Sequence, residues 1–433
     1  MKTIYVAFAA DQLLPAHLKI FSEAKKLGRL VVGVLTNAAV SEYKRSPLIS
    51  TDMRVDLIRS LTIVDEVVLQ EEASYLKVLS AVRPDIVVHG DDWKFGPLKN
   101  IRAELILALE QNGGELVEFP YSESSAKLKA REFDGRGISP SERLNALSEI
   151  IAKKGFVEII ETHSALSGLI IENLVESTDV GSVCFDGFWS SSLTDSTQKG
   201  LPDIEIVDTT SRLKTISEIN RVTSKPHVYD ADTGGRAEHI PYLVEQLESA
   251  GVSAMVIEDK TGLKKNSLFG NEVEQTYATI QGFQEKLAAA KRAKYNPNFF
   301  VIARLEGLIL DQGMDDVLSR SAHYIDAGAD AIMIHSRKKG PDEIFEFLQR
   351  YHSLGLSRPL MVVPSTFNSV HRSEWIERGV SIVCHANHLL RAAYPAMEAV
   401  ARSILHYGRS REAEEGGLCM SIKDILELIP GTK

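Results

Sequence analysis

Residues 258–267 hold an unusual density of reactive side chains: five ionisable residues, one glycine and an Asn-Ser pair. They follow the apolar run 254–257, which predicts a buried strand. Polar groups placed where a strand ends and a loop begins indicate a site rather than a core. Gly262, Lys264 and Asn266 suit a loop that closes over a substrate as a lid and excludes water.

Carboxylates gather at the ends of two predicted strands in this part of the chain. Asp230 and Asp232 end one strand, and Glu258 ends the next. Three hard oxygen donors without an all-protein cage suit Mg²⁺, which keeps several waters and takes substrate oxygens as ligands. Taken alone, the Asp pair with Gly234 and Gly235 would also fit an Asp-rich turn.

Two basic residues accompany the carboxylates. Arg304 ends the apolar run 299–303, so it either pairs with Glu258 or Glu306 or binds an anionic substrate, because an unpaired buried guanidinium is unfavourable. His335 ends a further apolar run and is either a satisfied core histidine or a ligand contact. With the Lys-rich loop, these groups predict a small, highly anionic substrate such as a phosphorylated or phosphonylated oxo-acid.

Eight strand patterns, most of them separated by helical patterns, carry these residues. They supply the eight β/α units of a (β/α)₈ barrel, and the polar residues follow the strands, where barrel sites lie. Helices are expected at 240–250, 273–291, 314–327 and 341–351. The expected strands are 157–161, 183–188, 227–230, 254–258, 299–304, 331–335, 360–363 and 382–384.

The first part of the chain alternates short strands and helices, which predicts a parallel, doubly wound sheet. Strands are expected at 4–8, 30–35, 66–69, 85–89 and 115–119, and helices at 16–26, 51–61, 75–81 and 101–111. The polar segment 121–140 predicts a connector. We therefore expect an α/β protein in which a small doubly wound domain at 1–135 precedes a barrel domain at 136–433.

The composition is that of a globular protein with two domains or three: 433 residues, 44% hydrophobic and 25% charged. A net charge of −10 argues against a nucleic acid or an anionic membrane as partner. The N-terminal apolar run is too short for a signal peptide, and no stretch approaches the roughly 20 apolar residues of a membrane helix. We expect a cytoplasmic protein that acts on small molecules.

The segment 258–267 resembles the signature loop of the phosphoenolpyruvate phosphomutases, in the isocitrate lyase/PEP mutase superfamily. The resemblance covers roughly residues 145–405. It implies an isomerase that interconverts phosphoenolpyruvate and phosphonopyruvate with Mg²⁺, the step that forms a carbon-phosphorus bond in phosphonate biosynthesis. The matching residues are Glu258-Asp259-Lys260, Lys264, Asn266-Ser267, Asp203, Asp230, Asp232 and the segments 187–193, 233–235, 302–304 and 333–336.

The same resemblance implies a role for each site residue. Asp230 would bind Mg²⁺ directly, while Asp232 and Glu258 would hold its waters. The implied substrate-binding residues are Trp189, Ser191, Ser192, Leu193, Ser267 and Arg304, and the implied catalytic residues are Asp203, Lys264, Asn266, Arg304 and His335.

Moving a phosphoryl group from an enolate oxygen to carbon depends mainly on charge neutralisation and positioning. Asp203 is therefore either a nucleophile or a group that only orients the transferring phosphoryl, and both roles stay open. The alternative reaction in the superfamily is phosphonopyruvate hydrolysis, but hydrolases usually lack an asparagine at the position of Asn266. A carbon-carbon lyase is not expected, because its catalytic cysteine loop has no counterpart here.

Residues 1–130 resemble the cytidylyltransferase-like nucleotidyltransferases. Active members carry His-x-Gly-His at the first helix N-terminus, where imidazoles meet nucleotide phosphates, but here the motif is Leu14-Pro15-Ala16-His17. Glu123 would also bring negative charge beside a triphosphate. We expect a structural or nucleotide-sensing module, with an active phosphonate cytidylyltransferase as the alternative. The implied nucleotide contacts are His17, Lys44, Arg54, Asp91 and Trp93.

The end of the chain bears on assembly. Members of the superfamily associate by exchanging a C-terminal helix, and the long apolar segment 389–406 fits that element. We therefore expect a homodimer or homotetramer whose small-molecule partners are phosphoenolpyruvate and phosphonopyruvate.

Overall fold

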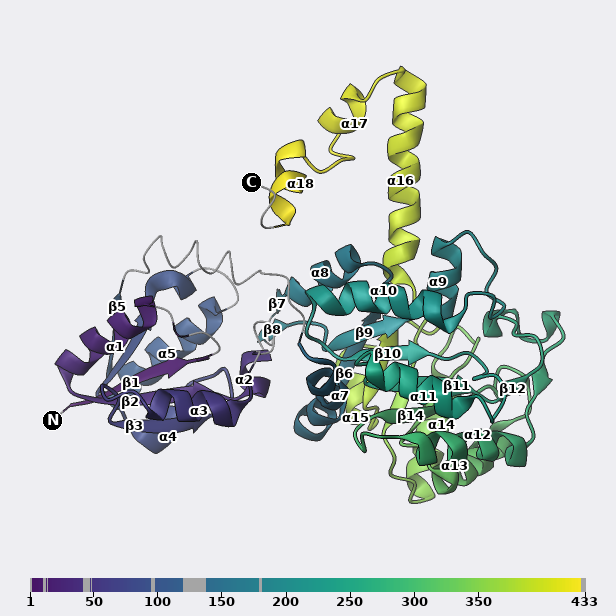
Figure 1. Cartoon of the computed structure of the whole chain (residues 1–433), viewed down its shortest axis with the longest axis horizontal. Helices are drawn as coiled ribbons and strands as arrows, with labels where there is room; N and C mark the ends of the chain where they lie inside the picture. The colour runs from purple at the N-terminus through teal and green to yellow at the C-terminus, as the bar shows by residue number, and fades with distance from the viewer. Residues whose placement is uncertain are drawn as a thin grey trace. The chain divides into compact units, whose positions relative to one another are not determined.

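A computed structural model of the chain describes residues 2–10, 13, 15–41, 47, 49–94, 98–119, 138–178 and 181–429. They form two compact units, one built from residues up to 119 together with Glu172–Cys184, and one from 138–171 and 185–429 (Figure 1). The expected connector 121–140 lies almost entirely outside the described residues. Among the described helices, none combines the length and the apolar character needed to cross a membrane.

The first unit is a five-stranded parallel sheet with the strand order β3-β2-β1-β4-β5. Side chains alternate along a strand, so Ile4 shares a buried cluster with Phe21 of α1, whereas Tyr5 shares one with Leu79 of α4 and Leu105 of α5. Helices on both faces confirm the doubly wound arrangement. The elements are β1 (Thr3–Phe8), α1 (Pro15–Leu27), β2 (Arg29–Leu35), α2 (Asn37–Ser41), α3 (Thr51–Arg59), β3 (Glu66–Gln70), α4 (Leu76–Val82), β4 (Ile86–Gly90), η1 (Asp91–Lys94), α5 (Lys99–Asn112) and β5 (Glu115–Phe119).

The second unit contains a closed barrel of eight parallel strands, which confirms the expected (β/α)₈ fold. The barrel strands are β6 (Val157–Glu161), β9 (Gly187–Ser190), β10 (His227–Asp230), β11 (Ala254–Glu258), β14 (Phe300–Leu305), β15 (Ala331–Ile334), β16 (Leu360–Val362) and β17 (Ile382–His385). The helices that accompany them are α7 (Pro140–Lys154), α8 (Ala165–Asn173), α9 (Ser192–Gln198), α10 (Thr209–Val222), α11 (Ile240–Ser249), α12 (Ile280–Ala293), α13 (Met314–Ala327), α14 (Asp342–Ser353) and α15 (Arg372–Glu377).

Two expected elements are wrong in their bounds. The second barrel strand was expected at 183–188 but begins at Gly187, because Gly181–Val183 (β8) pairs antiparallel with Glu176–Thr178 (β7) instead. A short apolar run does not reveal its own strand partner, so the pattern placed the strand too early. The helix expected at 273–291 begins only at Ile280, where the Thr279 side chain caps it; Thr276–Tyr277 (β13) pairs with Lys260–Thr261 (β12).

Alternation along the strands decides which side chains enter the barrel. Val228 of β10 and Val256 of β11 belong to the cluster that fills the barrel interior. Since every second residue of a strand faces the same way, Asp230 and Glu258 also point inward, at the C-terminal ends of their strands. Asp259, the residue after Glu258, faces the surrounding helix layer instead.

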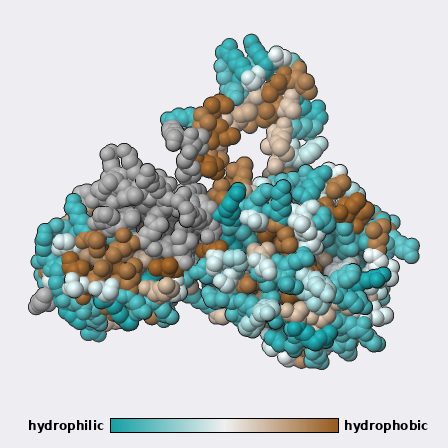
Figure 2. Space-filling model, in the orientation of Figure 1, coloured by the Kyte–Doolittle hydropathy of each residue, from teal (hydrophilic) through white to brown (hydrophobic). Residues whose placement is uncertain are grey.

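The chain ends in three helices, α16 (His388–Tyr407), α17 (Arg411–Glu415) and α18 (Ile422–Leu428). The segment expected at 389–406 coincides with α16, and none of the twenty residues of that helix is buried. Figure 2 shows apolar surface along this C-terminal extension. Its exposed apolar side chains include Tyr394, Met397 and Leu405, which are 68%, 61% and 83% exposed.

Candidate functional site

The inward-pointing polar residues at the strand ends come together. Arg304 of β14 lies with its Nη2 3.7 Å from the Glu258 Oε2 atom and 3.4 Å from the Nδ1 of His335. Glu258 and His335 are only 2% and 5% exposed. A carboxylate from β11, a guanidinium from β14 and an imidazole from the end of β15 therefore lie in one small region that solvent hardly reaches.

Arg304 is held in place by neighbouring groups. Its Nε donates to a carboxylate oxygen of Glu306, and its Nη2 donates to the Ser267 hydroxyl at 2.8 Å. Burial alone would raise the pKa of Glu306, but the Arg304 and Lys260 cations beside it hold that pKa well below its usual value. Of the alternatives given by the sequence, the structure therefore shows the internal ion pair, in an orientation that turns the guanidinium toward the site.

The lid, defined as residues 262–275 between β12 and β13, closes onto the carboxylates. Lys264 donates from its Nζ to Asp203 Oδ1 at 2.8 Å and also contacts Asp232 and the Ser192 hydroxyl. Asn266 donates from its Nδ2 to the other Asp203 oxygen at 3.0 Å. Burial would lower the pKa of Lys264, but Asp232 and the carboxylates around it outweigh burial and raise it, so this ammonium stays charged.

The two serines after β9 use their hydroxyl groups on neighbouring residues of the site. Ser192 donates from its hydroxyl to Asp230 Oδ2 at 2.9 Å, and its backbone N–H reaches the same oxygen at 3.3 Å. Ser191 caps α9 by accepting from the N–H of Thr194 at 3.4 Å. Trp189 lies within β9, in the interior cluster, and its buried Nε1 has no hydrogen-bond partner among the described residues. Half-buried Leu193 follows in α9.

The sequence did not identify Arg212, which lies behind the Asp pair. From α10 it donates to Asp195 Oδ2 at 2.7 Å and to the backbone oxygen of Asp230 at 2.6 Å. Its guanidinium also stacks over the Tyr229 ring, 4.1 Å from the centroid. The helix pattern around 212 was not distinctive, and the partners are 17 to 18 residues away in sequence, so no local signal marked it.

The turn after Asp230 is strained and supported from both sides. Asp232 adopts a φ of 54°, a left-handed conformation that is unfavourable for a residue with a side chain. The next peptide is clamped, because the Thr233 N–H donates to Glu205 at 2.7 Å and the Thr233 oxygen accepts from Lys286 at 2.7 Å. Strain that the surroundings hold in place is a frequent property of functional sites.

The carboxylates fit a divalent cation that keeps its own waters. Among the described residues, no three His, Cys, Asp or Glu side chains come close enough to hold an ion by themselves. The buried Oε1 of Glu258 accepts no hydrogen bond within the described part of the chain, although the Lys260 ammonium lies 3.3 Å from it as an ion-pair partner. Burial would raise the pKa of Asp230, but the Lys264, Arg304 and Arg212 cations outweigh it and lower that pKa, so Asp230 stays ionised. Such a donor set suits Mg²⁺ with several waters.

The first unit places its expected nucleotide contacts differently. Arg54 is fully buried, and its guanidinium donates to the backbone oxygens of Leu35 and Ile49 at 2.7 and 3.2 Å. Trp93 in η1 is buried, stacks on His89 with ring centroids 3.7 Å apart, and donates to Glu118 at 2.7 Å. Asp91 is half-buried in the same η1 turn, and His17 lies against the Phe8 ring at 4.4 Å. Lys44 and Glu123 lie outside the described residues.

Comparison with known proteins gives the same division of the chain. The family model described as phosphoenolpyruvate phosphomutase matches residues 147–405, and the model described as cytidylyltransferase-like matches residues 11–134. A phosphonopyruvate hydrolase from Variovorax sp. (strain Pal2) is 38% identical over 246 residues, which are 56% of this chain and 83% of that protein. A phosphoenolpyruvate phosphomutase from Tetrahymena pyriformis is 32% identical, over 62% of this chain and 85% of that protein.

A solved structure agrees with the barrel. The crystal structure of a phosphonopyruvate hydrolase in complex with oxalate and Mg²⁺ superimposes with a TM-score of 0.57 at 33% identity, covering 67% of this chain and 95% of that chain. The relatives thus catalyse more than one reaction on one fold, so the family match identifies an enzyme superfamily without choosing the reaction. On this evidence the chain belongs to the phosphoenolpyruvate phosphomutase family, with a cytidylyltransferase-like domain ahead of the barrel.

Proposed function

We propose that the barrel is a Mg²⁺-dependent mutase that interconverts phosphoenolpyruvate and phosphonopyruvate. The observation that carries the proposal is the contact of both lid residues, Lys264 and Asn266, with the two oxygens of Asp203. A phosphoryl group in transit must be kept from water, and a lid held by these two contacts would keep water from the space at the C-terminal ends of the strands.

The carboxylates would hold the metal and the substrate together. Asp230 would bind Mg²⁺ directly, with Asp232 and Glu258 holding its waters, and the metal when bound would neutralise negative charge on the substrate oxygens. Ser192 keeps the Asp230 carboxylate oriented through two donors. Trp189, Ser191 and Leu193 would line the end of the pocket that takes the substrate carboxylate.

The phosphoryl group would lie against the basic residues. Arg304 presents a permanent cation, and Ser267 of the lid already contacts it at 2.8 Å. Burial, together with the nearby Arg304 cation, lowers the pKa of His335 to about 3, so this residue would act as a neutral hydrogen-bonding group. Asp203 accepts hydrogen bonds from Lys264 and Asn266. It would either take the phosphoryl group or orient it during transfer.

The second candidate reaction is the hydrolysis of phosphonopyruvate, which the 38% identity to a phosphonopyruvate hydrolase favours. The two reactions share the substrate pocket and differ in whether water reaches the phosphorus. Phosphorus NMR of the full chain with phosphonopyruvate and Mg²⁺ separates them. A growing phosphoenolpyruvate signal supports the mutase, free phosphate with pyruvate identifies the hydrolase, and the absence of any turnover contradicts both.

For the first unit we propose a non-catalytic role, as a structural or nucleotide-sensing module. The support is that Arg54 uses its donors on backbone carbonyls of its own domain, so they are not turned to a nucleotide. Incubating the full chain with CTP and a hydroxyalkylphosphonate tests this, because release of pyrophosphate would show an active cytidylyltransferase.

For assembly we propose that α16 packs against a second copy of the chain, in a homodimer or homotetramer. Among the described residues, α16 buries none of its twenty residues; Leu389 near its start packs against a buried apolar cluster, whereas Tyr394, Met397 and Leu405 further along are exposed, which leaves an apolar surface for a partner. Analytical ultracentrifugation of the wild type and of Met397→Glu tests the idea. A dimer or tetramer that the substitution dissociates is expected, whereas a wild-type monomer would contradict it.

A further inference from the structure

The lid joins the barrel through a very short stem. Its strand ladder consists of two residue pairs, Lys260 with Tyr277 and Thr261 with Thr276, and the Lys260 ammonium also donates to the Gln275 side chain at 2.8 Å. A two-stranded pairing of this length is marginal by itself in water. The stem therefore needs other contacts if Lys264 and Asn266 are to meet Asp203 in one fixed geometry.

Asp259 supplies the first of these contacts. This carboxylate points away from the site into the helix layer and is completely buried. It accepts from the Glu306 N–H at 2.8 Å and from the Tyr324 hydroxyl at 2.9 Å, while its backbone oxygen accepts from the Ala278 N–H at 2.9 Å. One residue thus joins the outgoing end of the stem, the returning end and helix α13.

Helix α13 supplies the other contacts to the stem, and they come from one face of the helix. Asp316, Arg320 and Tyr324 are four residues apart, so their side chains lie in one row along the helix. The Arg320 guanidinium stacks over the Tyr277 ring at 3.6 Å from the centroid and donates to the Ala278 oxygen at 2.9 Å.

Two members of this row, Asp316 and Arg320, also form a hydrogen-bonded group with Tyr277 of the stem. The Tyr277 hydroxyl donates to Asp316 Oδ2 at 2.7 Å, and Arg320 Nε donates to the same oxygen at 3.0 Å. The returning end of the stem is therefore held on its ring face, its hydroxyl and its backbone.

Gly307 makes room for this arrangement. A Cβ atom at that position would lie 2.5 Å from the Tyr277 hydroxyl oxygen and 2.5 Å from a methyl carbon of Val317. Real Cβ atoms do not approach other atoms so closely, so any side chain at 307 would push the Tyr277 ring away from α13.

We propose that Asp259, Asp316, Arg320 and Tyr324 form an anchor for the lid stem and are positioning residues for the reaction. Among the described residues, their side chains bond to the stem, to one another and to the Glu306 N–H, and to none of Asp230, Asp232 and Glu258. They act by holding Tyr277 and Ala278, and through them the lid that carries Lys264 and Asn266. The kinetic consequence rests on the proposed function, but the effect on the lid does not.

The test measures the lid and the reaction separately in Arg320→Met, Arg320→Lys and Tyr277→Phe. Hydrogen exchange of segment 262–278 should be on the order of tenfold faster in Arg320→Met, because the stem opens locally. With phosphonopyruvate and Mg²⁺, kcat should fall on the order of tenfold while KM changes less, since the lost contacts matter in the closed state. Arg320→Lys, which keeps the charge without the planar fork, should lie between Arg320→Met and the wild type.

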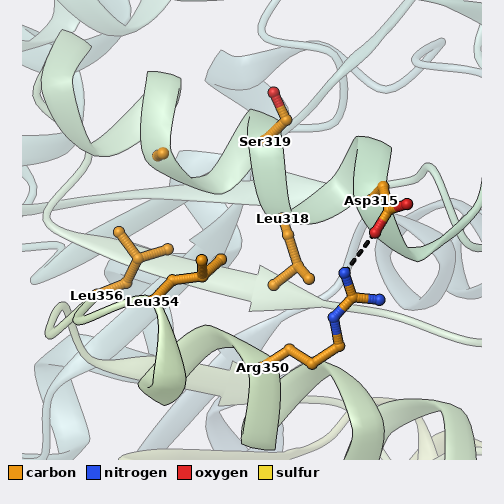
Figure 3. A pocket seen from close by; sticks show the side chains of 7 residues that line it. Asp315, Leu318, Ser319, Arg350, Leu354 and Leu356 are labelled. Atoms are coloured by element: carbon orange, nitrogen blue, oxygen red, sulfur yellow. Dashed lines mark hydrogen bonds and ion pairs between the residues drawn. The ribbon is translucent and has the colours of Figure 1, made fainter.

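A matched control lies on the same helix. Asp315, next to Asp316, forms a surface ion pair with Arg350 beside a pocket of about 320 Å³ lined by Leu318, Leu354 and Leu356 (Figure 3). Asp315 is 90% exposed and Arg350 43%, so Asp315→Asn removes a charge from α13 without touching the anchor. Lid exchange and kcat in Asp315→Asn should match the wild type.

Three outcomes decide the matter. Unchanged lid exchange and kcat in both Arg320→Met and Tyr277→Phe, with only a lower melting temperature, would make the network merely structural and overturn the proposal. If Arg320→Met does not fold, Tyr277→Phe decides, since the loss of its bond to Asp316 should still speed lid exchange several-fold. If the wild type shows no turnover, the proposed function fails, and the exchange of segment 262–278 still tests the anchor.

Discussion

Both units of the chain are parallel α/β structures with polar residues near the ends of their strands, yet those residues behave differently. In the first unit, Arg54 donates to backbone oxygens and Trp93 to Glu118, and both are packed into the core. In the barrel, a buried oxygen of Glu258 accepts no hydrogen bond among the described residues and is balanced only by the Lys260 ammonium 3.3 Å away, and Lys264 lies among carboxylates supplied by other loops.

The two units differ in how much hydrogen-bonding and charge-pairing capacity their buried polar groups have left for a ligand. A buried group that its own domain satisfies stabilises the fold and has little capacity for a ligand. A buried group with spare lone pairs, or a charge balanced only across a movable lid, can exchange its partners for a substrate or a metal. Sites in this fold lie at the strand ends, but a polar residue at a strand end is not by itself a site. What distinguishes the two units is whether the hydrogen-bonding capacity of these residues is already used within their own domain.

The largest effect is expected from Asp230→Ala. Removing the proposed direct ligand should lower turnover by about a thousandfold or more and abolish the response to Mg²⁺, measured by phosphorus NMR over a range of Mg²⁺ concentrations. Asp208→Ala is the control, because Asp208 is a carboxylate of the same barrel that only caps α10. A nearly active Asp230→Ala variant would remove the metal assignment.

The next effect concerns Arg54→Met in the first unit. The buried backbone oxygen of Leu35 and the half-buried backbone oxygen of Ile49 would lose their donor, which should destabilise that unit by about 3 kcal/mol. Turnover by the barrel should stay within about twofold of the wild type, since the site draws on other residues. Urea unfolding followed beside the NMR assay checks both statements, and a parallel loss of turnover would show that the units are not independent.

A smaller effect is expected from Asn266→Ala in the lid. Losing the contact with Asp203 should reduce phosphoenolpyruvate formation by about 10- to 100-fold, while the free energy of unfolding changes by about 0.5 kcal/mol or less. Asn271→Ala is matched to it, because Asn271 belongs to the same lid but pairs with exposed Asp311. Equal turnover in the two variants would exclude Asn266 from the site.

The smallest effect is a dependence of barrel stability on pH. Burial, aided by Arg143 and Arg212, lowers the pKa of His227 to about 3, whereas in the unfolded chain this histidine has its ordinary pKa near 6.5. The unfolded state therefore binds more protons between these values, so stability is complete above pH 6.5 and falls as the solution is acidified. The loss at pH 5 should be on the order of 1 to 2 kcal/mol.

The measurement is the difference in unfolding free energy between pH 7 and pH 5, for the wild type and for His227→Gln. Asn220, whose side-chain oxygen lies 3.3 Å from the His227 ring, can also accept from glutamine, which keeps the substitution mild. The variant should show a smaller difference. Identical differences in the two proteins would assign the acid sensitivity to other groups.

Much of this structure could be predicted because parallel strands that are buried on both faces appear in the sequence as short continuous apolar runs. Strands such as β10 and β11 have the bounds that the sequence indicated, and that alone places Asp230 and Glu258 at one end of a barrel. Long-range partners could not be predicted. Lys264 and Asp203 meet across 61 residues, and the Asp316, Arg320 and Tyr324 row is an ordinary polar stripe until the position of Tyr277 is known.

Helix α16 has a consequence for how the protein behaves on dilution. Twenty residues with an internal proline at 395 and no buried side chain gain little from intramolecular packing, and isolated helices of this kind are marginal in water. If a second copy covers α16, mass action governs its order, so its helicity and melting rise with protein concentration while those of the barrel do not. The helicity of α16 would then report the concentration of the protein itself.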